Sequence, residues 1–271
     1  MSSIHPYVWI KKRGSSKILF LIIFYHLSMP VFSMAGSFRI TPVVTKLNAK
    51  MKNTVIRVTN TGDEKLTVQL SVKEWNQDET GSDTYQPTKD IVFFPKIVTI
   101  EKDEERIIRI GYQGKENVAS ERAYRLFVEE LPIIEPGETV LKFALTMAVP
   151  IYISPLKEIK KPSLENIEFF GGKLALNIKN SGNTHIFVKR ITVTVIDEQN
   201  MELFKKDNKG LNILAGAAGT VAIEIPGKDC IRANKVRVAI EAEDNALERD
   251  FILDKTQCVD SKENAKDPGG L

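Results

Sequence analysis

The stretch LKFALTMAV, residues 141–149, decides the fold. Its odd-numbered positions all carry large apolar side chains, and its even-numbered positions carry lysine, alanine or threonine. A period of two indicates a β-strand with one apolar face. That face either packs into the core of its own sheets, or belongs to an edge strand offered to a partner that adds a strand of its own.

The chain on both sides of this stretch repeats the same period from residue 38 onward. Short runs rich in Val, Ile, Thr and aromatic residues alternate with clusters of Gly, Asn, Asp and Pro, and long segments of helical period are absent. This spacing predicts an all-β protein of antiparallel sandwiches or barrels. The expected strands span residues 54–59, 66–75, 96–100, 106–112, 124–130, 140–153, 173–179, 186–196, 220–225, 235–242 and 247–253.

Two segments of the chain resemble each other, which indicates two such sandwich or barrel units. VIRVTNTG at residues 55–62 resembles LALNIKNSG at residues 174–182, each an alternating strand followed by an Asn-x-Gly turn. Asn and Gly suit this turn because both tolerate positive φ. A lysine-rich, proline-bounded linker lies between the two copies. The predicted organisation is a signal peptide at 1–35, sandwiches at 36–155 and 163–260, a linker at 156–162 and a loose tail at 261–271.

The leader predicts export. It combines a cationic region at residues 11–17, an apolar run at 18–27 and a small-x-small signal at 33–35, the pattern of a cleaved signal peptide. A transmembrane anchor is disfavoured because the run is short and is interrupted by His26 and Pro30.

Composition excludes several classes of function. Four of the 38 Lys and Arg residues lie in the leader, so the body holds 34 basic against 35 acidic residues. We therefore expect no attraction to nucleic acid. No segment after the leader is long and apolar enough to span a bilayer, so we also expect no membrane insertion after cleavage. The body has a single histidine, His185, and no nucleophile elbow, phosphate loop or paired-cysteine cluster. We predict a non-enzyme without catalytic residues, metal or cofactor. We expect Trp75, Phe93, Phe94 and Tyr112 to pack in the core or in cross-strand pairs.

The two cysteines, Cys230 and Cys258, are predicted to form a disulfide. Export places them in an oxidising compartment. The strands expected at 235–242 and 247–253 form a hairpin whose turn lies midway between the two cysteines, so their sulfurs would face each other across its open end. This bond would act as a structural staple.

Four segments in order resemble one family. They are FFPK at 93–96, RIIRI at 106–110, YRLFVEELP at 124–132 and IYISP at 151–155. Together they are similar to the periplasmic pilus-assembly chaperones of the chaperone-usher pathway, the PapD-like superfamily. The resemblance implies two immunoglobulin-like sandwiches in an L or boomerang arrangement. It also implies a periplasmic protein that binds, folds and stabilises pilus or fimbrial subunits by donor-strand complementation and delivers them to an outer-membrane usher.

Residue by residue, the resemblance assigns a binding strand. Subunits of this kind lack their last strand, and the chaperone lends its own until the usher exchanges it. The donated side chains would be Leu141, Phe143, Leu145 and Met147.

The chain departs from the better-known branch where the subunit's C-terminal carboxylate is anchored. The usual arginine and lysine positions hold Val44 and Pro150, which suggests a divergent, archaic-type branch. If the strand at 124–130 pairs antiparallel with the 140–153 strand, Arg125 lies beside the end of the latter and is our first substitute anchor. The alternative is that Arg125 pairs with Glu121 or another local acid. Weaker candidates are Arg109 and Lys46.

Two competing functions are kept. One is a structural subunit or adhesin of a surface fibre, which would have a single incomplete sandwich behind an N-terminal extension. The other is an exported carbohydrate-active enzyme, which would need two carboxylates facing one cleft.

Overall fold

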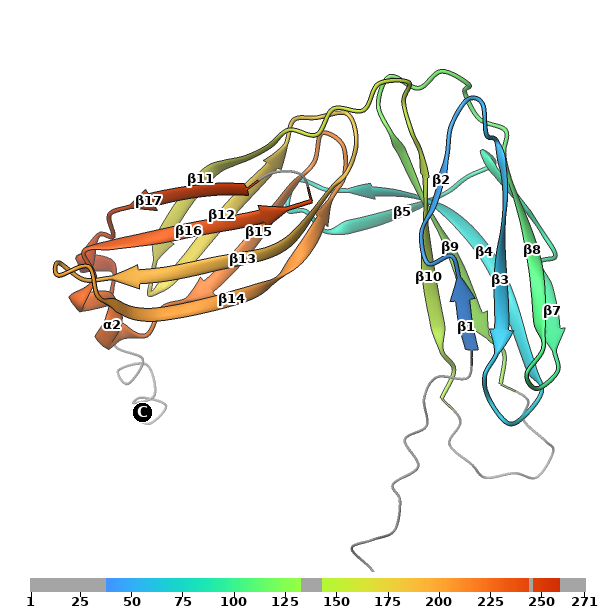
Figure 1. Cartoon of the computed structure of the whole chain (residues 1–271), viewed down its shortest axis with the longest axis horizontal. Helices are drawn as coiled ribbons and strands as arrows, with labels where there is room; N and C mark the ends of the chain where they lie inside the picture. Colours follow the sequence, from blue (N-terminus) through green and yellow to red (C-terminus); the bar gives the residue numbers. More distant parts are fainter. Residues whose placement is uncertain (1–37, 133–142, 244–245, 259–271) are drawn as a thin grey trace, which may run out of the picture. The chain divides into compact units, whose positions relative to one another are not determined.

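The computed structural model describes residues 38–132, 143–243 and 246–258, so the predicted signal peptide, Leu141 and the C-terminal tail lie outside the described residues. Residues from Ser37 onward form one compact unit, built almost entirely of strands (Figure 1). Its first half contains β1 (Phe38–Thr41), β2 (Thr45–Leu47), β3 (Asn53–Asn60), β4 (Leu66–Gln77), β5 (Asp83–Pro87), β6 (Ile91–Phe94), β7 (Ile97–Ile100), β8 (Glu105–Tyr112), β9 (Arg122–Glu130) and β10 (Thr146–Ile153).

These strands form two sheets. The first has the order β1-β3-β8-β6, with every neighbouring pair antiparallel. The second has the order β2-β10-β9-β4-β5, with β7 also paired to β4. All its pairs are antiparallel except β2 and β10. The 124–130 strand is therefore the antiparallel neighbour of the 140–153 strand, as the sequence predicts.

The second half repeats the architecture. One sheet has the order β11-β12-β15 and the other β14-β13-β16-β17. Its elements are β11 (Pro162–Phe170), β12 (Lys173–Asn180), β13 (Ile186–Ile196), β14 (Glu202–Ile213), β15 (Ala218–Glu224), α2 (Gly227–Arg232), β16 (Lys235–Ala242), β17 (Ala246–Phe251) and the short 3-10 turn η1 (Lys255–Gln257). The prediction of two β-sandwiches is confirmed, whereas the boomerang arrangement stays a prediction.

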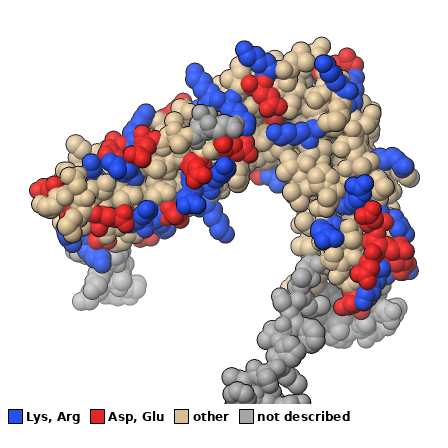
Figure 2. Space-filling view, in the orientation of Figure 1, with Lys and Arg blue, Asp and Glu red and all other residues tan. Residues whose placement is uncertain are grey.

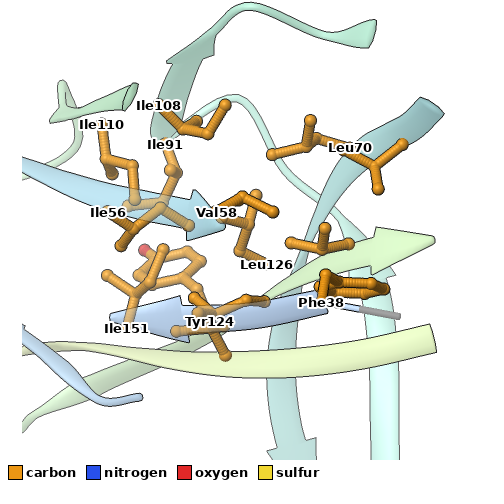
Figure 3. Packing of buried hydrophobic residues seen from close by; sticks show 14 of the residues in the cluster. Phe38, Ile56, Val58, Leu70, Ile91, Ile108, Ile110, Tyr124, Leu126 and Ile151 are labelled. Carbon is orange, nitrogen blue, oxygen red and sulfur yellow. The ribbon is translucent and has the colours of Figure 1, made fainter. Parts of the chain in front are cut away.

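Each half has its own core. In the first, buried side chains from both sheets meet between them, among them Ile56, Ile108, Tyr124, Leu126 and Ile151 (Figure 3). In the second, a separate cluster joins the β12, β13, β15 and β16 side chains. Period-two alternation places these residues on inner faces. The face seen in Figure 2 carries intermixed Lys, Arg, Asp and Glu, consistent with the nearly neutral body.

The similarity between residues 55–62 and 174–182 does not arise from positive φ at the asparagine, contrary to the prediction from the sequence. Neither Asn60 nor Asn180 has positive φ. Instead both are buried at the end of a strand, where the side-chain amide donates to carbonyls of neighbouring segments, such as Ile100 for Asn60 and Ile213 for Asn180. The side-chain oxygen accepts from the backbone N–H two residues later. The Asn is therefore selected as a satisfied buried hydrogen-bonding group.

The predicted disulfide is present. Cys230 and Cys258 are bonded across the open end of the β16–β17 hairpin, with Cα atoms 5.7 Å apart. Cys230 lies in α2, a helix that the sequence analysis did not anticipate. Closing a loop of this length stabilises a fold by about 3.6 kcal/mol in the chain-entropy model.

Candidate functional site

One edge of β10 is open over most of its length. The strand pairs with β9 from Thr146 to Ile153. On its other side, β2 pairs with it only from Ile151 to Ile153. Within the described part of the chain, no strand covers this second edge at residues 146–150. Unpaired backbone N–H and C=O groups at such an edge are ready to bind an added strand.

The apolar ladder changes character along its length. Val149 and Ile151 are buried in the first core, and Met147 packs against it. By contrast, the Phe143 and Leu145 side chains are 84% and 37% exposed. The inner half of the ladder therefore packs in the chain's own core, the outer half is uncovered, and the binding of a partner strand stays a prediction.

The strand itself is shorter than predicted. β10 begins at Thr146 rather than at residue 140, and residues 143–145 have no assigned strand structure. One contact continues the pairing, since the Glu130 N–H donates to the Leu145 carbonyl at 2.9 Å. A segment with one paired side and exposed apolar side chains has little to fix it in the free protein.

Arg125 lies where the sequence predicts, directly opposite Pro150 in the β9–β10 pair. Its guanidinium stacks on the Trp75 ring, 3.8 Å from the centroid, which holds the planar group flat. Its acidic neighbour is Asp83, at 3.5 Å, and not the Glu121 considered from the sequence. The Arg125 side chain is 21% exposed.

Lys46 lies at the same end of β10. It is exposed on β2, beside Tyr152 in the parallel register. Glu243 is close enough that Lys46 contributes to lowering the pKa of this carboxyl, after the larger effect of the Lys160 hydrogen bond. Lys46 and Arg125 thus lie on the two strands that neighbour β10 near this end, opposite Tyr152 and Pro150 respectively.

Arg109 is not brought to this place. It lies on β8, in the other sheet, opposite Val55 and Phe94 in register. Its neighbours on that outer face include Val92 and Ile107, and these apolar side chains are exposed. Phe94 is 68% exposed, so of the two expected roles, core packing and cross-strand pair packing, it does not take the first. In β6 the inner positions are taken by Ile91 and Phe93, so alternation turns Phe94 outward.

A junction cluster that the sequence analysis missed lies next to Arg125. Trp75, Ala123, Tyr152 and Leu214 are buried together. Tyr152 stacks on His185 with ring centroids 3.9 Å apart. The carboxylate of Glu121 accepts a hydrogen bond from the His185 backbone N–H at 3.0 Å. The same carboxylate lies 2.7 Å from the His185 ring nitrogen Nδ1. His185, to which the sequence assigned no role, therefore joins the two halves of the chain.

Tyr152 gives the junction a measurable alkaline signature. Burial raises the pKa of its hydroxyl to about 12, although a hydrogen bond from Asn212 opposes the shift. The folded state favours neutral Tyr152, so stability is retained below the ordinary pKa of 10.0 and lost as pH rises toward 12. From pH 9 to pH 11 this group should cost about 1.4 kcal/mol.

We expect urea unfolding at these two pH values to give a smaller loss of stability for Tyr152→Phe than for the wild type. The difference between the two losses isolates the phenol, because all other titrating groups are shared. Equal losses in the two proteins would contradict a buried neutral hydroxyl.

The described residues contain no group of three metal-ligating side chains. None of the helices among them is long and apolar enough to cross a membrane.

Comparisons with known proteins agree with this geometry. Residues 37–158 match the family model described as pili and flagellar-assembly chaperone, PapD N-terminal domain. A comparison with curated proteins found no match.

Solved structures extend the likeness over both sandwiches. A chain in the CsuC–CsuE chaperone–tip adhesion subunit pre-assembly complex, from archaic chaperone-usher Csu pili of Acinetobacter baumannii, is 20% identical with a TM-score of 0.55, covering 79% of this chain and 98% of that one. The YadV chaperone is 16% identical with a TM-score of 0.51, covering 80% and 100% of the two chains. The class 5 fimbriae chaperone CfaA is 18% identical with a TM-score of 0.50, covering 80% and 99%.

At these identities the likeness establishes the fold, and the archaic branch stays a prediction. The family match covers the sandwich that carries β10, Lys46 and Arg125. Residues 37–158 of this chain are similar to the PapD N-terminal domains of pili and flagellar-assembly chaperones.

Proposed function

We propose that this protein is an exported periplasmic chaperone that holds one pilus or fimbrial subunit at a time by donor-strand complementation. The single observation that carries the proposal is the open edge of β10, which continues into the exposed Phe143 and Leu145. A subunit that lacks a strand exposes its core and an unpaired edge, both of which lead to aggregation. The open edge of β10 can supply the missing backbone partners, and the exposed side chains can fill the gap in the core.

The energetics favour side chains as the main source of affinity. Burying a side chain the size of Phe143 or Leu145 contributes roughly 1.5–3 kcal/mol. Leu141, outside the described residues, continues the same alternation and is proposed as a third donated side chain. Met147 already packs against the chaperone's own core, so we assign it a smaller share.

Lys46 and Arg125 would fix the position at which the bound subunit, called the guest below, ends its strand. A guest strand on the open edge, parallel to β10 and in line with β2, would finish where β2 begins at Thr45. Its C-terminal carboxylate would then lie between Lys46 and Arg125. We therefore propose both residues as the carboxylate anchor, and we set Arg109 aside because it lies in the other sheet.

The periplasm is the proposed compartment. The leader pattern predicts export, and the Cys230–Cys258 disulfide is typical of oxidising surroundings. Two sandwiches, each with its own core, favour the chaperone over a fibre subunit built on one incomplete sandwich.

Delivery to an outer-membrane usher needs a second surface that stays free while the guest is bound. The outer face of β3, β8 and β6, with Val55, Phe94 and Ile107 exposed around Arg109, is suitable because it lies in the sheet that does not contain β10. We expect Phe94→Ser with Ile107→Ser to lower capture of the guest complex by the usher about tenfold without changing guest binding. An equal loss in guest binding would contradict two separate surfaces.

Co-expression tests the proposed function directly. The mature protein and a candidate subunit, both exported, should elute together as a one-to-one complex on a sizing column. The subunit expressed alone should aggregate or be degraded. Concentration-dependent polymers of the mature protein alone would instead support the fibre-subunit alternative.

A further inference from the structure

The β4–β5 hairpin reaches from the first sandwich to the second. Its strands pair from Lys73 opposite Pro87 to Gln77 opposite Asp83. The loop between them is fixed by Asp78, whose Oδ1 accepts from the backbone N–H groups of Thr80 and Ser82 at 2.8 and 3.0 Å. A hydrogen bond from the Thr80 hydroxyl, followed by these backbone hydrogen bonds, lowers the pKa of Asp78. The hairpin therefore ends in an ordered loop.

Gln77 makes the connection with its side-chain amide. Its Nε2 donates to the Asn212 carbonyl at 2.9 Å, and its Oε1 accepts from the Leu214 N–H at 2.9 Å. A carbonyl at one residue and an N–H two residues later form the pair that a neighbouring strand would bind. The primary amide of Gln77 thus takes the place of a backbone peptide at the end of β14.

Two further contacts surround this bond pair. Gly81 has a φ of +83°, and a Cβ there would lie 2.7 Å from the Ala218 carbonyl, so the loop tip touches β15 with no room for a side chain. Trp75, on the same hairpin, is buried with Leu214 and packs against Ala217. The Arg125 guanidinium also stacks on Trp75.

We propose that the β4–β5 hairpin is a clasp and that Gln77 is the positioning residue that fixes the second sandwich against the sheet that carries β10, Lys46 and Arg125. A fixed junction lowers the entropy lost when a guest spans both halves. This consequence for the guest rests on the proposed function, whereas the clasp itself can be tested on the chaperone alone.

The test is native-state amide hydrogen exchange of the mature protein. Gln77→Met keeps the side-chain length and removes both hydrogen bonds. Two neutral hydrogen bonds of ordinary strength correspond to about a thirtyfold change in an equilibrium constant. We expect exchange of the Leu214 N–H to rise about thirtyfold. Exchange of the His185 N–H, which donates to Glu121 elsewhere in the junction, should also rise, while core amides such as Val128 and Val193 stay protected.

A second variant separates opening of the clasp from local loss of an acceptor. Gln77→Glu retains an acceptor for the Leu214 N–H but places a carboxylate beside the Asn212 carbonyl and Asp83, so both junction amides should still exchange faster. The matched control is Gln69→Met, which changes an exposed glutamine of the same strand and should change neither amide. Faster exchange at Leu214 alone in Gln77→Met, with His185 unchanged, would overturn the clasp. If the clasp is observed but no subunit binds, the proposed function fails and the clasp does not.

Discussion

Replacing Phe143 and Leu145 together by serine is expected to abolish recovery of the guest subunit and to leave the free energy of unfolding of the free chaperone unchanged. The two side chains are 84% and 37% exposed, so their removal costs the free protein little. In the complex both would be buried, and their loss would remove roughly 3–6 kcal/mol. That energy corresponds to a drop in affinity of about a hundredfold to ten-thousandfold.

The control for this prediction is Phe170→Ser. Phe170 is 78% exposed at the end of β11 in the second sandwich. It is therefore about as exposed as Phe143 but lies away from the open edge of β10. Subunit recovery by sizing chromatography and urea unfolding of each free variant are the measurements. Full recovery with the double variant would remove β10 as the donated strand. Loss of recovery with Phe170→Ser would show that the assay responds to any exposed phenylalanine.

The central strands could be predicted from the sequence because their apolar and polar residues alternate as their buried and exposed positions do. Runs such as 54–59, 106–112 and 186–196 each have a buried inner face that fixes the period of two. Several of the strands it missed are short or polar. β2 has three residues and β5 is exposed at four of its five positions. β14, with Lys205, Lys206 and Asp207 in its middle, has few apolar positions to reveal a strand.

The candidate site could be predicted only where register determines it. Antiparallel pairing of two recognisable strands placed Arg125 opposite the end of the ladder, and the structure has it opposite Pro150. The partner of Arg125 could not be predicted, because Asp83 lies on a strand that the pattern did not reveal. The contacts of Gln77 and His185 with residues far along the chain depend on how the two sandwiches meet, which leaves no local pattern in the sequence.

The second large effect is expected at the carboxylate anchor. Removing both cations, with Lys46→Ala and Arg125→Ala, should weaken guest binding about a hundredfold to a thousandfold, because a carboxylate paired with two charges loses both partners. Arg125→Lys should not restore binding. The Arg125 guanidinium stacks on the Trp75 ring at 3.8 Å. A lysine can neither stack flat on this ring nor offer two parallel N–H donors.

A double-mutant cycle that also varies the C-terminus of the guest separates loss of the carboxylate anchor from general destabilisation of the chaperone. A peptide of the guest's last strand with a free carboxylate should lose affinity in the double variant, whereas the same peptide with a C-terminal amide should bind wild type and variant alike. Arg125→Met, which keeps an apolar cover over Trp75, should behave as Arg125→Ala does if charge is the cause. Arg109→Ala, on the other sheet, should leave both peptides unaffected. An equal loss for the carboxylate and the amide would mean that Lys46 and Arg125 shape the surface without anchoring the chain end.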